Sequence, residues 1–174
     1  MLIAMIVAMD KEGYIGHKGE LPWRLSTDIK RFKKITEAEG NNAVIMGRKT
    51  WDSLPKKYKP LSGRLNIVMS RNSEWRAEGA SNALYPGRAI EIAYSEGCEE
   101  CWIIGGSKIY ELFLDRVEEL HITEVNTQKS GEIRFPKWKK EEWTQEIIES
   151  KTKNEYDEYD TICLLYTSPS PRDS

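Results

Sequence analysis

The chain has few of the residues that build disulfide scaffolds and metal centres. Its 174 residues include 3 cysteines and 2 histidines, and an odd number of cysteines argues against a framework of paired disulfides. Cys98 and Cys101 form a CxxC motif, which a redox pair or half of a zinc site would use. The sequence has no second CxxC, and Cys101 opens an apolar run. We therefore expect structural thiols and no metal.

A strong charge imbalance and a long apolar run are also lacking. The 26 basic and 28 acidic residues are interspersed and give a net charge of -2, so we expect no nucleic-acid partner. The apolar start, residues 2–9, is too short to span a membrane and has no basic segment before it. We expect a cytoplasmic protein with one hydrophobic core.

Apolar runs of strand length alternate with helical patterns over the first two thirds of the chain. This order predicts an α/β single domain, with a mainly parallel central sheet and helices on both faces. Later strand patterns follow one another without helices, which predicts antiparallel partners and an antiparallel C-terminal strand. The predicted strands are 2–8, 43–46, 65–70, 101–104, 119–125, 143–150 and 159–165, and the predicted helices are 27–38, 50–53, 88–96 and 108–113.

The last residues of the chain differ from the rest. Residues 167–174 read TSPSPRDS, and prolines cannot donate to a strand ladder. We expect the domain to cover residues 1–165 and residues 166–174 to be a disordered or foreign C-terminal extension.

Asp28 interrupts an apolar stripe on a predicted helix. Leu25, Asp28, Phe32 and Ile35 are spaced by three, four and three residues, which places them on one helix face. A carboxylate in apolar surroundings is costly unless a cation or several hydrogen-bond donors meet it. Asp28 therefore indicates a site for a ligand that carries donors.

A simpler interpretation of Asp28 is that it belongs to a helix terminus. With Ser26 or Thr27 as the cap, an acidic first-turn residue would complement the helix dipole. The preceding segment favours a site instead. Glycines at 13, 16 and 19 make a flexible loop that ends in a bulky apolar corner at residues 21–23, as in a lid over a pocket.

Two predicted strands end in glycine turns that open helices. One runs into Gly47 and the cations Arg48 and Lys49, and the other runs into Gly105 and Gly106. Each turn alone is common, and neither GxGxxG nor GxxxxGK[ST] is present there. Because parallel strands bring their carboxyl ends to one edge, the pair indicates a dinucleotide lying across the sheet.

The cations near these turns exceed what a pyrophosphate needs. Arg48, Arg71 and Lys108 all follow predicted strand ends. An extra phosphate, as on NADPH, would use the surplus charge.

Further motifs follow one another in order from about residue 2 to residue 165. They are Ile15-Gly16, Leu21-Pro22-Trp23, Asp28, Phe32, residues 44–51 (VIMGRKTW), residues 60–64 (PLSGR), Ile104-Gly105-Gly106, Tyr110, Thr123 and Phe135-Pro136. Together they resemble the dihydrofolate reductase family of the bacterial chromosomal or plasmid type. The resemblance implies NADPH-dependent reduction of 7,8-dihydrofolate to tetrahydrofolate, with hydride transfer to C6 and protonation of N5. It also implies antifolate inhibitors as ligands, and we expect a monomer.

The resemblance implies a catalytic group made of Asp28, Leu21, Trp23 and Thr123. Asp28, assisted by Thr123, would bind N3 and the 2-amino group of the pterin, and Leu21 and Trp23 would lie in the lid. Gly131 would lie in a supporting loop.

The resemblance also implies the residues that hold substrate and cofactor. Arg64 would pair with a glutamate carboxylate of the substrate, and Lys33 is a further candidate there. The substrate walls would be Ile6, Ala8, Phe32, Leu54, Leu61 and Ile104. The cofactor residues would be Ala8, Ile15, Gly16, Gly47, Arg48, Lys49, Thr50, Ser70, Arg71, Gly105, Gly106, Ser107, Lys108, Ile109 and Tyr110, although Tyr110 is equally natural as a core tyrosine.

Some features depart from the family pattern and leave alternatives. The segment 55–59 is longer and more basic than expected, and Arg71 stands where the family often has a hydroxyl. The alternatives are a reductase of another pterin or of a pyrimidine from riboflavin synthesis, a nucleotide-binding module without turnover, and a thiol-disulfide oxidoreductase centred on Cys98 and Cys101.

Overall fold

The computed structural model describes residues 1–16, 23, 25–127 and 132–169 of the chain. The strands within these residues are β1 (Leu2–Asp10), β2 (Tyr14–Gly16), β3 (Asn42–Gly47), β4 (Leu65–Met69), β5 (Ala80–Ala83), β6 (Glu100–Gly105), β7 (Glu119–Val125), β8 (Ile133–Arg134), β9 (Thr144–Lys151) and β10 (Thr161–Thr167). The α-helices are α1 (Ser26–Glu37), α2 (Arg48–Ser53), α3 (Pro86–Ser95) and α4 (Ser107–Phe113).

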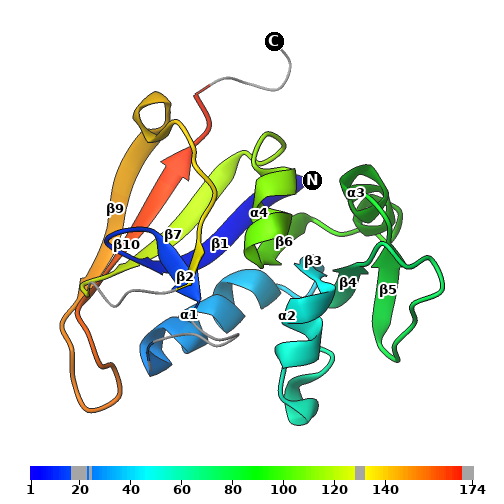
Figure 1. Ribbon diagram of the computed structural model, residues 1–174, viewed down its shortest axis with the longest axis horizontal. Helices are drawn as coiled ribbons and strands as arrows, with labels where there is room; N and C mark the ends of the chain where they lie inside the picture. Colours follow the sequence, from blue (N-terminus) through cyan, green and yellow to red (C-terminus); the bar gives the residue numbers. More distant parts are fainter. Residues whose placement is uncertain (17–22, 24, 128–131, 170–174) are drawn as a thin grey trace.

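One eight-stranded sheet, in the order β5-β4-β3-β6-β1-β7-β10-β9, forms the centre of the molecule (Figure 1). The strands from β5 to β7 pair in parallel, whereas β10 pairs antiparallel with both β7 and β9. The predicted α/β fold with a mainly parallel sheet and an antiparallel C-terminal strand is confirmed. The structure corrects one detail, because β7 is parallel to β1 and the antiparallel part begins only at β10. Helix α4 carries the chain back across the sheet before β7, so β7 runs in the direction of β6.

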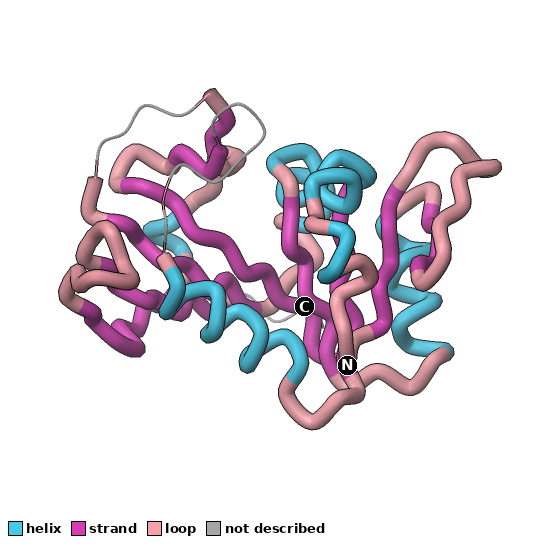
Figure 2. Tube along the Cα trace, turned by 90° about the horizontal axis from the view of Figure 1, so that it is seen from below, coloured by secondary structure: helices cyan, strands magenta, loops and turns pink. Residues whose placement is uncertain are grey.

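Helices cover both faces of the sheet, as predicted. Odd-numbered residues of β1, such as Met5, pack in one buried cluster with residues of α3 and α4. Even-numbered residues, such as Ile6, pack in a second cluster with Phe32 and Ile35 of α1 and Trp51 of α2. Figure 2 shows α1 running alongside the strands on one face of the sheet. Burial on both faces explains the continuous apolar runs of these strands, and it places α1 against Ile6.

The end of the last strand differs from the prediction. β10 continues to Thr167, and Tyr166 is 1% exposed and packs edge-on against Trp138. The boundary expected after Leu165 therefore lies inside the strand, because Tyr166 supplies a buried aromatic side chain to the sheet. Residues 170–174 lie outside the described residues, so the expected extension stays a prediction for them.

No helix in the described ranges is long and apolar enough to cross a membrane.

Candidate active site

Asp28 lies in the first turn of α1, where this helix meets β7. Thr123 Oγ1 of β7 donates a hydrogen bond of 2.6 Å to Asp28 Oδ1, and Thr123 pairs in register with Ala8 of β1. Burial raises the pKa of Asp28 above its ordinary value, while the Thr123 bond and the nearby charge of Arg31 oppose that rise. The structure therefore brings Asp28 and Thr123 together as a half-buried carboxylate with free acceptor capacity.

The predicted apolar walls come from several elements, and most of them gather in one buried cluster. Ile6 belongs to the buried cluster on the α1 face, and Phe32, Leu54, Leu61 and Ile104 are partly buried side chains packed against the same cluster. Ala8 lies two residues further along β1 and packs against a smaller cluster that contains Trp23. These side chains pack between α1 and the sheet, and Phe32 lies one turn after Asp28 on the same helix.

Trp23 packs against Leu25, Val125 and Ala8 and is 7% exposed. Its indole Nε1 is buried and has no hydrogen-bond partner within the described part of the chain. A buried indole N–H normally finds an acceptor, so Trp23 leaves a polar atom beside Ala8 that no described residue satisfies. The predicted lid residue Leu21 and the loop residue Gly131 lie outside the described residues.

Arg64 is anchored to the far end of α1. Its Nη1 donates to Thr36 Oγ1 at 3.0 Å and its Nε donates to the Ser62 carbonyl at 2.9 Å. Thr36 in turn donates to the Phe32 carbonyl at 2.8 Å. Burial lowers the pKa of Arg64, and the nearby Glu37 carboxylate opposes that change. A guanidinium has five N–H donors, so the held Arg64 keeps donors for a further acceptor.

Lys33 is exposed on α1, one turn before Thr36. Its position on the same helix keeps it as a second cation near that end of the site.

The two glycine turns lie next to each other at the carboxyl ends of β3 and β6. A methyl group built on Gly47 would stand 2.9 Å from Ile109 Cγ1 and 3.9 Å from the Gly105 carbonyl, and one on Gly106 would stand 3.8 Å from Thr50 Oγ1. The N-cap positions of α2 and α4 are Gly47 and Gly106, and neither helix has a side-chain cap. The two turns thus lie side by side as one backbone cradle, in which Gly47 has no room for a Cβ against Ile109. Two helix N-termini without side-chain caps are the arrangement that a phosphate-bearing dinucleotide uses.

Gly105 has a φ of +117°, and its peptide bond to Gly106 is cis. Only glycine adopts such a φ readily. Tyr110 lies behind this turn, with its hydroxyl donating to the Ile6 carbonyl at 2.8 Å, and burial raises its pKa. Tyr110 therefore supports both the glycine turn and β1 from inside the core.

The remaining predicted cofactor residues lie around the same cradle or beside β1. Arg48, Lys49, Arg71 and Lys108 are exposed, Ser70 is buried at the end of β4, and Ile15 and Gly16 belong to the short strand β2. Arg48 lies 3.7 Å from Asp52, and Ser107 Oγ donates to the Arg134 carbonyl at 2.8 Å. The cations are accessible at the edge where the cradle lies.

The CxxC motif has no sign of a reactive thiol. Cys101 is fully buried in β6, and burial raises its pKa to about 12. Burial also raises the pKa of Cys98. Because a reactive thiol needs a lowered pKa, both cysteines fit a structural role. In the ranges that the structure describes, no cluster of His, Cys, Asp and Glu could hold a metal ion.

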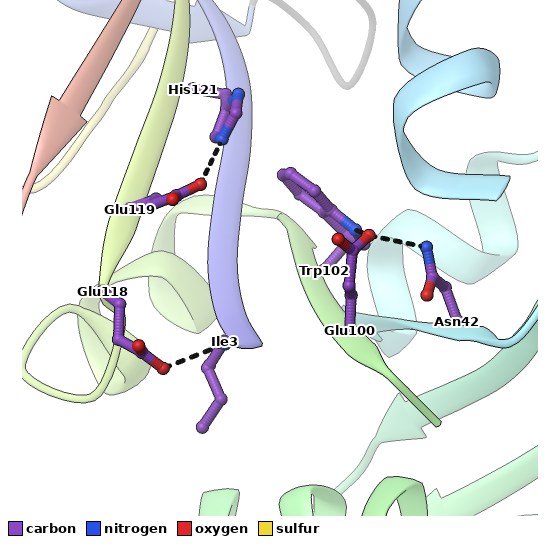
Figure 3. Close-up of polar contacts among 7 residues, drawn as sticks. All are labelled: Ile3, Asn42, Glu100, Trp102, Glu118, Glu119 and His121. Atoms are coloured by element: carbon purple, nitrogen blue, oxygen red, sulfur yellow. Dashed lines mark hydrogen bonds and ion pairs between the residues drawn. The ribbon is translucent and has the colours of Figure 1, made fainter. Parts of the chain in front are cut away.

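A row of polar side chains occupies the amino ends of the central strands (Figure 3). His121 Nε2 lies 2.8 Å from Glu119 Oε1, and the His121 ring packs edge-on against Trp102 at 4.9 Å. Glu100 accepts bonds from Asn42 and from the Trp102 indole. Burial lowers the pKa of His121. These contacts connect β3, β6 and β7 near the ends of the strands that lie opposite the glycine turns.

Reasoning from the sequence missed two residues of the site. Thr36, which holds Arg64, was detectable because it lies four residues after Phe32 and so shares its helix face. Asp157, which bonds Thr27 beside Asp28, had no local signal, because it follows Thr27 by 130 positions.

An open groove of about 570 Å³ lies away from Asp28. It runs beside Trp138 and Trp143, with Glu111 and Lys139 among its lining residues. None of the predicted site residues that the structure describes lines it.

Comparison with known proteins gives a consistent result over the whole chain. The family model for dihydrofolate reductase matches residues 2–168. A type 3 dihydrofolate reductase from Salmonella typhimurium is 35% identical over 167 residues, covering 96% of this chain and 97% of that protein. A Bacillus subtilis dihydrofolate reductase is 33% identical over 165 residues, covering 95% and 94% respectively.

Longer relatives and a solved structure match as well. A bifunctional dihydrofolate reductase-thymidylate synthase from Arabidopsis thaliana is 42% identical over 145 residues, covering 76% of this chain. The chain spans only about a quarter of the length of such bifunctional relatives, 26% in this case. The structure of an Enterococcus faecalis dihydrofolate reductase complexed with NADP(H) and RAB-propyl superposes with a TM-score of 0.81, at 27% identity and with 97% of each chain covered.

Proposed function

The chain belongs to the dihydrofolate reductase family, and from that premise we propose that it reduces 7,8-dihydrofolate to 5,6,7,8-tetrahydrofolate with NADPH. The observation that carries the proposal is the Asp28–Thr123 pair, which stands on an apolar surface a short way along the sheet from a glycine cradle. A half-buried carboxylate of this kind needs a ligand with donors, and a cradle without side chains needs a ligand with phosphates.

Asp28 would bind the amidine edge of the pterin. This edge presents N3–H and a 2-amino N–H side by side, and a carboxylate accepts two parallel bonds on its two oxygens. Thr123 already donates to Oδ1, which favours the ionised form and directs the remaining lone pairs away from β7. A negative charge at this edge raises the basicity of the pterin ring and so favours the protonation of N5 that accompanies hydride transfer to C6, and Asp28 and Thr123 are therefore the proposed catalytic pair with Leu21 and Trp23.

When bound, NADPH supplies the hydride that C6 of the substrate accepts. The residues that would hold its phosphates are Gly47, Arg48, Lys49, Thr50, Ser70, Arg71, Gly105, Gly106, Ser107 and Lys108, with Ala8, Ile15, Gly16, Ile109 and Tyr110 toward the nicotinamide. The cradle fits because Gly47, which packs against Ile109 and has no room for a side chain, and Gly106 leave the backbone N–H groups at the starts of α2 and α4 without side-chain caps.

Trp23 would exclude bulk water from the reacting ring. Its buried indole N–H, which lacks a partner among the described residues, is a donor for the pterin or for one ordered water. The apolar side chains Ile6, Ala8, Phe32, Leu54, Leu61 and Ile104 would pack on the pterin and benzoyl groups.

Arg64 would bind a carboxylate of the glutamate part of dihydrofolate. Two of its nitrogens are held by Thr36 and Ser62, so the guanidinium is oriented before the ligand arrives. A fixed guanidinium fork matches a carboxylate in two parallel bonds. Lys33 would assist with the second carboxylate.

The proposal extends to the localisation and the oligomeric state of the enzyme. We propose a cytoplasmic monomer whose small-molecule ligands are dihydrofolate and antifolate inhibitors, with a reductase domain that includes β10.

The test is a turnover assay with both reaction partners. Protein, NADPH and dihydrofolate are mixed, and the loss of NADPH absorbance is compared with the tetrahydrofolate formed. We expect equal amounts of NADPH consumed and tetrahydrofolate formed, and no loss when dihydrofolate is omitted. A folded sample that binds NADPH without consuming it would contradict the proposal and support a nucleotide-binding module.

A further inference from the structure

We propose that Asp157 is a positioning residue for Asp28: from the loop between β9 and β10 it fastens the first turn of α1 and so determines where the catalytic carboxylate stands. The inference rests on the proposed function, since it concerns the same carboxylate. Asp157 does not touch the pterin site itself in this proposal, and it acts through Thr27.

The first turn of α1 lacks a cap from its own sequence. The helix begins at Ser26, and Leu25 occupies the cap position without a side-chain hydrogen bond. Free N–H groups in the first turn of a helix need acceptors. The alternative in which Ser26 or Thr27 caps this helix is therefore wrong, because both residues lie inside it.

Asp157 supplies the missing acceptors from a distant part of the chain. The Thr27 backbone N–H donates to Asp157 Oδ1 at 2.9 Å, and Thr27 Oγ1 donates to Asp157 Oδ2 at 2.5 Å. Leu25 pairs with Asp157 in an isolated antiparallel bridge, and the Ser26 N–H donates to the Tyr156 carbonyl at 3.3 Å. Three consecutive residues before Asp28 are thus held by one loop.

The loop that carries Asp157 is itself well anchored. Asn154 Oδ1 accepts from the N–H groups of Tyr156 and Asp157 at 2.7 and 3.0 Å, and the Asn154 N–H donates to the Asp157 carbonyl at 3.0 Å. Asp157 is 3% exposed. Because the loop holds the Asp157 carboxylate in place, its two oxygens stay where they are and keep Thr27, and with it the first turn of α1, in one position.

The strand that follows this loop also pairs with the strand that carries Thr123, the second residue that positions Asp28. β10 follows the loop, and Cys163 of β10 pairs in register with Thr123, the residue that bonds Asp28 Oδ1. Asp28 therefore stands between Thr123 on one side and the Thr27–Asp157 contact on the other. Thr123 lies on β7 and Asp157 lies in the loop that leads into β10, and because β7 and β10 pair along their whole length, the spacing of the two anchors is fixed and determines the position of the carboxylate.

The charge of Asp157 has a second, separable effect on Asp28. In the part of the chain that the structure describes, the titratable and charged neighbours of Asp28 are Arg31 on α1, Asp157 on the loop and Cys163 on β10. Burial is the main cause that raises the pKa of Asp28, the Asp157 charge adds to it, and the Arg31 charge opposes it. Removing the Asp157 charge alone should therefore lower the pKa of Asp28.

Three substitutions separate the anchoring from the charge. Asp157→Asn keeps an acceptor oxygen and the side-chain size but removes the charge, whereas Asp157→Ala removes both. Thr27→Val removes the hydroxyl bond and leaves the Asp157 charge in place. Asp160→Asn is the matched control, because it is the same change in the same loop, at a carboxylate that accepts from the Lys153 N–H.

The readouts are kcat and KM for dihydrofolate across pH, with melting temperature as a check of folding. We expect Asp157→Ala to lower kcat/KM about tenfold or more, mainly through KM, since a displacement of about 1 Å at a reacting group costs up to ~100-fold. Asp157→Asn should recover most of that loss and move the inflection of the kcat/KM profile to lower pH. Thr27→Val should raise KM without moving the inflection, and Asp160→Asn should match the parent.

The outcomes that overturn the inference are distinct from failure of the function. A parent protein without turnover contradicts the proposed function. A parent with turnover, together with Asp157 variants whose KM and pH profile equal those of the parent, overturns the inference alone. Variants that only melt earlier, with parental KM and inflection per folded molecule, overturn it too, because they leave Asp157 a purely structural residue. If Asp157→Ala does not fold, the KM and pH profile of Asp157→Asn and the KM of Thr27→Val decide instead, and parental values in both variants overturn the inference.

Discussion

Replacing Thr123 with valine tests the electrostatics of the site most specifically. Valine has nearly the same shape as threonine and removes only the hydroxyl that donates to Asp28 Oδ1 at 2.6 Å. A hydrogen bond to a charged group contributes roughly 1.5–3 kcal/mol. With Asp28 ionised, Thr123→Val should therefore lower the unfolding free energy by about that amount, or by roughly 3–12 °C in melting temperature for a chain of this size.

The pH dependence of this loss follows from the direction of the pKa change. Burial already raises the pKa of Asp28 in the folded protein, and the Thr123 bond lowers it, so removing the bond raises it further. Between the unfolded and folded pKa values the folded protein binds more protons than the unfolded one, so stability falls as the pH rises through that window. The deficit of Thr123→Val should therefore be small at acid pH and complete above the raised pKa.

The assays are thermal melts across pH and the kcat/KM profile for dihydrofolate. We expect the inflection of the profile to move to higher pH and KM to rise about tenfold, as loss of roughly 1.4 kcal/mol of binding implies. Thr161→Val deletes the same hydroxyl from a buried threonine of the neighbouring strand β10 and is the matched control. A deficit that is equal at all pH values, or an inflection that stays in place, would refute this account of Asp28.

Three further predictions concern the cofactor cradle and the substrate carboxylate. Gly47→Ala places a methyl group 2.9 Å from Ile109 Cγ1, and such overpacking costs roughly 1–3 kcal/mol. NADPH affinity and melting temperature should both fall, and an unchanged NADPH titration would argue against the cradle. Arg48→Ala should weaken NADPH more than NADH in the same titration, whereas an equal loss for both places Arg48 away from the extra phosphate. Arg64→Lys should raise KM for dihydrofolate about tenfold through loss of paired bonding but leave a pterin substrate without a glutamate group unaffected, and an equal rise for both substrates would count against a carboxylate contact.

Much of the sheet was predictable because its central strands are buried on both faces. Such strands are short continuous apolar runs, and β1, β3, β4 and β6 lie within one or two residues of their predicted bounds. β5 was not predicted, since its sequence ASNA has no apolar pattern and its pairing comes from β4. β2 and β8 are similarly too short to give a periodic signal.

The site was predictable only where its residues are close together in the sequence. Asp28 is conspicuous within one helix, and the glycine turns follow directly on apolar strands. Thr123, which bonds Asp28 across 95 positions, was identified from the family resemblance and not from any local pattern. Asp157 had neither source, because an aspartate in a polar loop is ordinary until the fold places it against Thr27.

Asp28 carries the central claim, and the substitution Asp28→Asn tests it most directly. Asparagine keeps the size and one acceptor but presents an amide instead of a second carboxylate oxygen, so it cannot accept both pterin donors. At neutral pH we predict a folded protein, with NADPH affinity as in the parent and kcat/KM for dihydrofolate lowered at least about 100-fold. Equal kcat/KM for the variant and the parent would contradict the account, because Asp28 would then be only a first-turn residue of α1.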